Sequence, residues 1–175
     1  NKKLKFLFVA RLEINKGIKE LLNVALFYRD KITLTIVGDG AMSEKINSFI
    51  KKHKLFSTIK CLGFIDFGEA LLKVYRSHDF FIFPSYSEGL PQVILEAMAS
   101  GCLVMSSSVG SIPYVIKNNH NGILFKPNNQ RSLNSCMKNL IDGIYDIKNL
   151  KKNSLLTANN YTFEKQIKIL ENSLN

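Results

Sequence analysis

The sequence has few of the residues and patterns that mark metal centres, disulfide frameworks and membrane spans. Three of its 175 residues are cysteines, Cys61, Cys102 and Cys136, and no pair of them has the spacing of a metal site. Their odd number, and the apolar stretches around Cys61 and Cys102, predict buried and reduced thiols in a cytosolic protein. No run approaches about 18 apolar residues, so we expect no membrane-spanning helix.

Acidic residues are scarce beside basic ones, with 14 aspartates and glutamates against 24 lysines and arginines, for a net charge of +10. Such a charge can attract nucleic acid, anionic lipid or anionic small molecules. The sequence lacks arginine-rich tracts and basic runs interleaved with aromatic residues, which argues against a nucleic-acid partner. Lysines near positions 51–54 and 151–152 are interpreted as solvated helix faces, with weak attraction to an anionic membrane surface as the alternative.

Common catalytic arrangements are missing as well. His53, His78 and His120 stand apart, in no metal motif and no recognisable Ser-His-Asp set, and the loops hold no D-x-D cation site. The first residues lead directly into a strand-like run without an initiator Met or a signal peptide. We therefore expect one cytoplasmic domain over residues 1–175, cut from a longer protein.

Strand-like and helix-like segments alternate along the chain. The expected strands are Leu4–Ala10, Ile32–Val37, Thr58–Leu62, Asp79–Phe83, Cys102–Ser106 and Gly122–Phe125. The expected helices are Gly17–Tyr28, Ser43–His53, Glu69–Ser77, Pro91–Gly101, Ile112–Lys117, Gln130–Ile144 and Leu150–Leu174. Near-continuous apolar strands between helices predict an α/β fold, a doubly wound Rossmann-like parallel sheet with helices on both faces. Ligands of such sheets bind beyond the carboxyl ends of the strands.

The most informative motif follows the fourth expected strand. It reads E-G-L-P at 88–91 and L-E-A-M-A at 95–99, followed by Gly101. A strand, a glycine-bearing loop and a helix N-terminus together suit an anion, and Glu88 and Glu96 can accept hydrogen bonds from hydroxyl groups beside it. Helical spacing puts Glu96 on one face with Gln92, and we expect Val93, Ile94 and Ala97 to point toward the sheet. A nucleotide-sugar offers both a diphosphate and hydroxyl-rich rings.

This motif resembles the donor-site signature E-G-[FL]-P-x-x-x-[LI]-E-A-[MA]-A-x-G of retaining glycosyltransferases with the GT-B fold, in particular glycosyltransferase family 4. The run A-R-L-E-I-N-K-G at 10–17 resembles the family element G-R-L-x-x-x-K-G, with Ala10 where a glycine is usual. Tyr114 stands where the family often has a glutamate, and Leu103 where it has a proline. The resemblance implies the C-terminal, donor-binding half of a two-domain enzyme whose N-terminal half supplies the acceptor site.

The resemblance also implies roles for single residues. Arg11 and Lys16 would neutralise the leaving diphosphate, Glu96 would hold the ribose hydroxyls, and Glu88 would position the donor sugar. With Glu88, Arg11 and Lys16 as the catalytic set, the implied substrate-binding residues are Arg11, Lys16, Gly38, Gly40, Phe64, Glu88, Gly89, Leu90, Pro91 and Glu96.

From this resemblance we expect transfer of a hexose or N-acetylhexosamine, with retention and without metal or other cofactor, to a glycan or lipid-linked acceptor. UDP is the default nucleotide of the donor, with GDP and ADP as alternatives. The chain alone is expected to bind donor without useful turnover. Two other hypotheses stay open: a non-catalytic nucleotide-binding or regulatory module of the same fold, and an electrostatic adaptor for membrane or nucleic acid.

Overall fold

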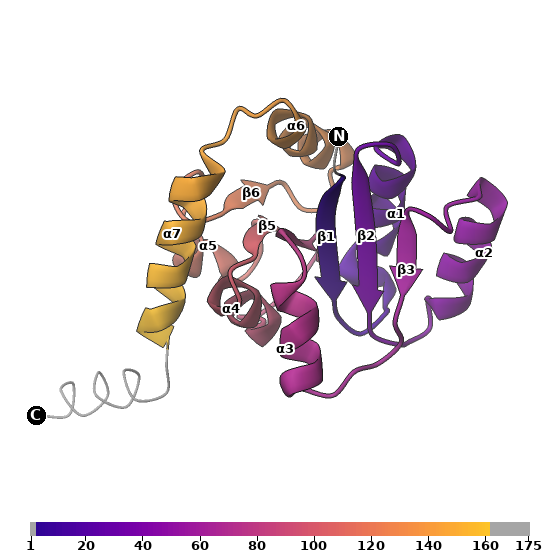
Figure 1. Cartoon of the computed structure of the whole chain (residues 1–175), viewed down its shortest axis with the longest axis horizontal. Helices are drawn as coiled ribbons and strands as arrows, with labels where there is room; N and C mark the ends of the chain where they lie inside the picture. The colour runs from indigo at the N-terminus through magenta and orange to yellow at the C-terminus, as the bar shows by residue number, and fades with distance from the viewer. Residues whose placement is uncertain (1–2, 162–175) are drawn as a thin grey trace, which may run out of the picture.

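A computed structural model describes residues 3–161, which form a six-stranded parallel sheet of order β3-β2-β1-β4-β5-β6 with helices on both faces (Figure 1). The strands are β1 (Leu4–Val9), β2 (Ile32–Val37), β3 (Ile59–Cys61), β4 (Phe80–Phe83), β5 (Leu103–Ser107) and β6 (Ile123–Phe125). Every expected strand is present within one residue at either end. Apolar continuity is a good guide here because strands covered on both faces need apolar side chains on both.

The helices are α1 (Ile18–Phe27), α2 (Ser43–His53), α3 (Glu69–Arg76), α4 (Gln92–Ala99), α5 (Ile112–Val115), α6 (Gln130–Ile141) and α7 (Ile147–Ala158), with 3₁₀ turns η1 (Ile14–Lys16) and η2 (Asn159–Tyr161). In Figure 1, α1 lies behind β1 and β2 and contacts α2 and α6. Helices α3 and α4 lie on the opposite face, where α7 packs on α4. The doubly wound Rossmann-like prediction is confirmed.

Helices α4 and α5 end two residues before their predicted ends, and the last two helices differ more from the prediction. Helix α6 ends at Ile141 rather than at 144, because Gly143 adopts a φ of +74° and its N–H turns back to the carbonyl of Leu140. Helix α7 begins three residues before the predicted Leu150, since the Asp146 carboxylate caps it by accepting a hydrogen bond from the Asn149 N–H at 3.1 Å. Of the predicted span 150–174, residues 162–174 lie outside the described part of the chain.

Aromatic side chains of β1 and β4 join the two halves of the core. The Phe6 and Phe80 rings stack with centroids 4.9 Å apart, and the Phe8 and Phe83 rings are 6.3 Å apart. Cys102 is buried as expected, whereas the prediction of a buried Cys61 is wrong: Cys61 is exposed on the edge strand β3. All three cysteines are free thiols.

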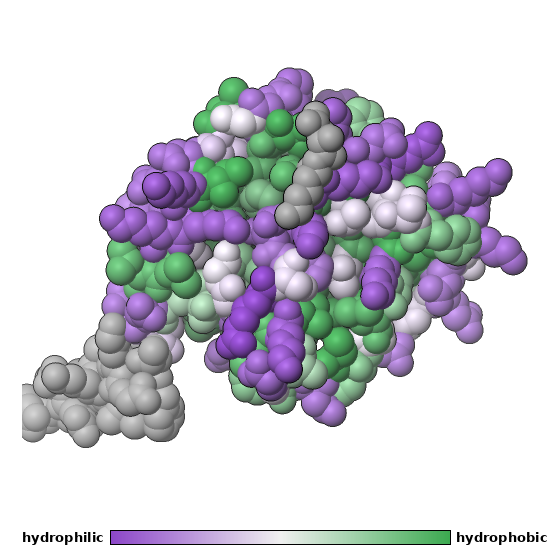
Figure 2. Space-filling model, in the orientation of Figure 1, coloured by the Kyte–Doolittle hydropathy of each residue, from purple (hydrophilic) through white to green (hydrophobic). Residues whose placement is uncertain are grey.

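Hydrophilic residues are spread over the face that Figure 2 draws, with hydrophobic ones between them. Within residues 3–161, no helix combines the length and the apolar content that crossing a bilayer requires.

The sheet order sets where a ligand can bind. The chain moves outward from β1 to β2 and β3, then returns to the other side of β1 with β4. Loops on either side of β1 therefore diverge at the carboxyl ends of β1 and β4, and this divergence opens a crevice in doubly wound sheets.

Candidate functional site

Lys16 and Glu88 meet at the junction of the β1 and β4 loops. The Lys16 Nζ lies 2.6 Å from Oε1 of Glu88, and the two side chains are 18% and 11% exposed. The Ser85 hydroxyl donates to the same Oε1 at 2.6 Å. Oε2 of Glu88 has no hydrogen-bond partner among the residues that the structure describes. The carboxylate is thus held by one oxygen and presents the other.

Direct backbone contact holds these two loops together. Gly17 has a φ of +69°, and a Cβ at this position would lie 2.0 Å from the carbonyl oxygen of Pro84. The Asn15 carbonyl accepts a hydrogen bond from the Tyr86 N–H at 2.8 Å, and its oxygen lies 3.1 Å from the Ser85 hydroxyl oxygen. The Lys16–Glu88 pair therefore sits on loops that cannot easily shift relative to one another.

Glu96 lies on α4, facing the crevice. Its Oε2 accepts a hydrogen bond at 3.0 Å from the hydroxyl of Tyr75, a fully buried residue of α3. Burial, and then the nearby Glu96 carboxylate, raise the pKa of the Tyr75 hydroxyl. The hydroxyl consequently stays protonated and acts as a donor to Glu96.

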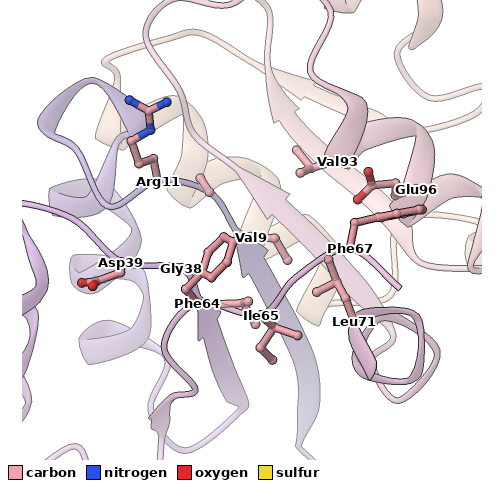
Figure 3. Close-up of a pocket in the computed structure, with 12 residues that line it drawn as sticks. Val9, Arg11, Gly38, Asp39, Phe64, Ile65, Phe67, Leu71, Val93 and Glu96 are labelled. Atoms are coloured by element: carbon pink, nitrogen blue, oxygen red, sulfur yellow. The ribbon is translucent and has the colours of Figure 1, made fainter. Parts of the chain in front are cut away.

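Two adjoining cavities occupy the crevice. One, of about 390 Å³, is mainly apolar and includes Phe64, Phe67 and Glu96 in its lining (Figure 3). The other, of about 400 Å³, is lined by Lys16, Glu88 and others. Both share the residues Val9, Ala10, Arg11 and Val93. The crevice is thus continuous, with an apolar end and a charged end.

The shared boundary corrects one prediction. Val93 was expected to point toward the sheet, but it lines both cavities, and Figure 3 shows it beside Glu96 on α4. Residues three apart on a helix share a face, so Val93 and Glu96 point the same way. Ile94 and Ala97 are buried, as predicted, and Gln92 lines the charged cavity.

Arg11 stands at the boundary of the two cavities with its side chain 78% exposed. Its guanidinium lies 3.3 Å from the Glu13 carboxylate, a contact that exposed groups exchange readily with water. An anion bound between the cavities can therefore recruit this guanidinium.

Both glycines of the loop after β2 lie against the backbone of the β1 loop. A Cβ would be 1.8 Å from the Ala10 carbonyl oxygen at Gly38 and 2.7 Å from the Leu12 carbonyl oxygen at Gly40, and of the two only Gly38 lines the apolar cavity. Between them, Asp39 lines the cavity, and hydrogen bonds from the Ser43 hydroxyl and the Gly40 N–H lower the pKa of its carboxyl. Asp39 follows the second expected strand with Gly38 and Gly40, but it was not among the predicted substrate-binding residues.

The other predicted residues lie around the crevice in different ways. Phe64 is 71% exposed over the apolar cavity. Pro91 lines the charged cavity and is the N-cap of α4. Gly89 and Leu90 connect Glu88 to α4 and line neither cavity; the Gly89 carbonyl accepts a hydrogen bond from the Ser111 N–H at 3.2 Å.

Sequence patterns did not indicate Ser85, Tyr75 or Phe67. Ser85 follows the strand in a turn-rich loop, Tyr75 reads as an ordinary apolar position of α3, and Phe67 lies in a loop. Within residues 3–161, no three His, Cys, Asp or Glu side chains are grouped so as to hold a metal ion.

The comparisons with known proteins agree on one family. The model of the family described as "Glycosyl transferases group 1" matches residues 1–157. An uncharacterised glycosyltransferase of Methanocaldococcus jannaschii is 36% identical over 129 residues, which are 73% of this chain and 33% of that protein. The chain thus spans about a third of the length of this curated relative.

Solved structures share the fold. Alr3699/HepE from Anabaena in complex with UDP superposes with a TM-score of 0.83 at 21% identity, over 98% of this chain and 49% of that one. The C-terminal domain of LpcC, a glycosyl transferase group 1 family protein from Francisella tularensis, gives a TM-score of 0.79 at 22% identity, over 90% of this chain and 85% of that one. The observed sheet is that of the C-terminal domain of a GT-B protein.

Proposed function

Because the chain belongs to the glycosyl transferases group 1 family, we propose that it is the donor-binding half of a retaining glycosyltransferase. The enzyme transfers a hexose or N-acetylhexosamine from a nucleoside diphosphate sugar to a glycan or lipid-linked acceptor. UDP is the proposed nucleotide, which the UDP complex of the Anabaena protein supports. The acceptor site is assigned to the part of the parent protein that lies beyond the length matched here.

The observation that carries this proposal is the division of one crevice into two chemically different cavities. A nucleoside has an apolar base and a ribose that needs hydrogen-bond acceptors, which the apolar cavity with Glu96 provides. A diphosphate and a sugar need cations and polar groups, which Lys16, Arg11 and Glu88 provide next to it. A donor laid along the crevice meets each group in this order.

The mechanism follows from where negative charge develops. As the bond between the anomeric carbon and the diphosphate oxygen breaks, charge grows on the leaving diphosphate. Arg11 and Lys16 stabilise that charge more than the charge of the bound ground state, which lowers the barrier. The proposed reaction uses no metal ion.

Glu88 is assigned to the donor sugar. Its Oε1 is occupied by Lys16 and Ser85, so Oε2 is the oxygen that can accept hydrogen bonds from sugar hydroxyls. A carboxylate held in this way orients the ring near the reacting carbon, and we assign it positioning rather than nucleophilic attack.

The test is isothermal titration of the chain with UDP, GDP and ADP, each with and without EDTA. Glu96→Ala is expected to weaken UDP binding about 10- to 100-fold, since it removes one or two hydrogen bonds to a charged acceptor. Glu69→Ala is the matched control, because Glu69 is exposed on α3, pairs with Arg76 and lines neither cavity.

Three outcomes would contradict the proposal. These are no nucleotide binding at millimolar concentration, equal losses in Glu96→Ala and Glu69→Ala, and binding that EDTA abolishes. A parent protein that binds UDP-sugar without transferring or hydrolysing it would instead favour a non-catalytic nucleotide-binding module.

A further inference from the structure

A buried hydroxyl stands directly behind the proposed ribose ligand. Tyr75 is fully buried on α3, and its hydroxyl donates to Oε2 of Glu96 at 3.0 Å. Glu96 also lines the apolar cavity, so one carboxylate faces both the core and the crevice. In Figure 3, Glu96 extends from α4 at the rim, beside Phe67 and Val93.

Packing alone does not account for this hydroxyl. The Tyr75 ring lies 5.9 Å from the Phe81 ring, in a position where phenylalanine would fill the same space. A buried hydroxyl is costly unless it is hydrogen-bonded, and its one partner among the described residues is Glu96. The oxygen atom of Tyr75 therefore matters to the structure through Glu96.

The rest of Tyr75 is well anchored. The Cys102 thiol donates to its carbonyl oxygen at 3.1 Å, and α3 contacts α4. A donor fixed in the core defines where its acceptor must sit, because a hydrogen bond near 3 Å weakens steeply when it is bent or stretched. The Glu96 side chain is accordingly held toward one rotamer before any ligand arrives.

We propose that Tyr75 is the positioning residue of the donor site, holding Oε2 of Glu96 so that Oε1 faces the two ribose hydroxyls. This inference rests on the proposed function, in which Glu96 binds the ribose. Oε1 has no partner among the described residues, and a carboxylate oxygen can accept two hydrogen bonds. Preorganisation of this kind lowers the entropy that the side chain loses when nucleotide binds.

The experiment compares UDP with 2′,3′-dideoxy-UDP, which lacks both ribose hydroxyls. The measured quantity is the dissociation constant of the dideoxy nucleotide divided by that of UDP. It is obtained by titrating the wild type and Tyr75→Phe with each nucleotide. We expect Tyr75→Phe to reduce this ratio up to about tenfold, within the range of a hydrogen bond to a charged group, and to leave the affinity for the dideoxy nucleotide unchanged.

The matched control is Tyr28→Phe. The Tyr28 hydroxyl donates to the Asn134 carbonyl at 3.2 Å and lines neither cavity, so removing it should leave the ratio at the wild-type value. In a Glu96→Ala background, Tyr75→Phe should have no further effect on the ratio, because the group that it positions is gone.

The outcomes separate the two proposals. An unchanged ratio in Tyr75→Phe, or equal weakening of both nucleotides, would overturn the positioning role while leaving the ribose role of Glu96 intact. A wild-type ratio near one, or no UDP binding at millimolar concentration, would overturn the ribose role and the positioning role together. Thermal unfolding of each variant shows whether Tyr75→Phe keeps the fold.

Discussion

Replacing Gly17 with alanine is expected to destabilise the chain and to loosen the Lys16–Glu88 pair. Gly17 has a left-handed backbone, with φ +69°, and its α-carbon faces the carbonyl of Pro84. An alanine Cβ would lie 2.0 Å from that oxygen, so the β1 and β4 loops would have to separate by about 1.5 Å to reach ordinary contact.

The expected magnitude has two parts. The left-handed conformation costs alanine about 1 kcal/mol relative to glycine. Forcing two packed segments apart adds about 1–3 kcal/mol, as overpacking does in cores. The free energy of unfolding should therefore fall by about 2–4 kcal/mol, which lowers the melting temperature by roughly 4–16 °C in a chain of this size.

The chain offers a matched control in Gly143. Its φ is +74°, and nothing lies within 4 Å of a Cβ built there. Gly143→Ala thus tests the backbone strain without the close contact, and it should cost about 1 kcal/mol. Urea unfolding of both variants gives the difference directly. Equal losses in the two variants would refute the claim that loop contact, rather than backbone strain, constrains Gly17.

Two further changes test the electrostatics of the fold. Lys16→Met should lower the free energy of unfolding in urea by about 3 kcal/mol, because it leaves the mostly buried Glu88 carboxylate without its cation. Adding Glu88→Gln should restore part of that stability without restoring nucleotide binding. Simple additivity of the two losses in stability would contradict the pairing. Burial lowers the pKa of His78 below its ordinary value of 6.5, so the unfolded chain binds more protons than the folded one below about pH 6.5. Stability should then fall as the pH is lowered through this window, and His78→Gln should flatten the dependence measured by thermal unfolding. An unchanged slope in His78→Gln would contradict this role of His78.

The sequence predicts the sheet well because burial leaves little choice of residue. All four residues of β4 are buried, and its run of Phe80–Phe83 has no polar position that would fit a helix surface. Helix ends depend on single capping contacts instead. The Asp146 cap of α7 lies outside the apolar pattern, which is why the predicted start was three residues late.

The predicted topology places the four charged residues of the site at one edge of the sheet, but it does not tell which of them pair. Lys16 and Glu88 are 72 positions apart, and their contact depends on how closely the loops approach at Gly17. No sequence pattern predicts the role of Tyr75, since a tyrosine in an amphipathic helix is interpreted as a core residue. Helical periodicity tells which residues share a face of α4, whereas the packing of the helix decides which way that face points, and Val93 shows the difference.

The position of β1 has a consequence for how the chain acquires its fold. In the finished sheet Phe6 pairs with Phe80, and Leu7 with Phe81, across more than 70 residues of chain. During synthesis, the two edges of the apolar strand β1 therefore stay unpaired until first β2 and then β4 have been made. Non-local parallel pairing forms slowly, and an uncovered apolar strand is a template for aggregation. Chaperone dependence should thus be greatest while the segment up to residue 83 is still emerging from the ribosome, and should decline once β4 has docked.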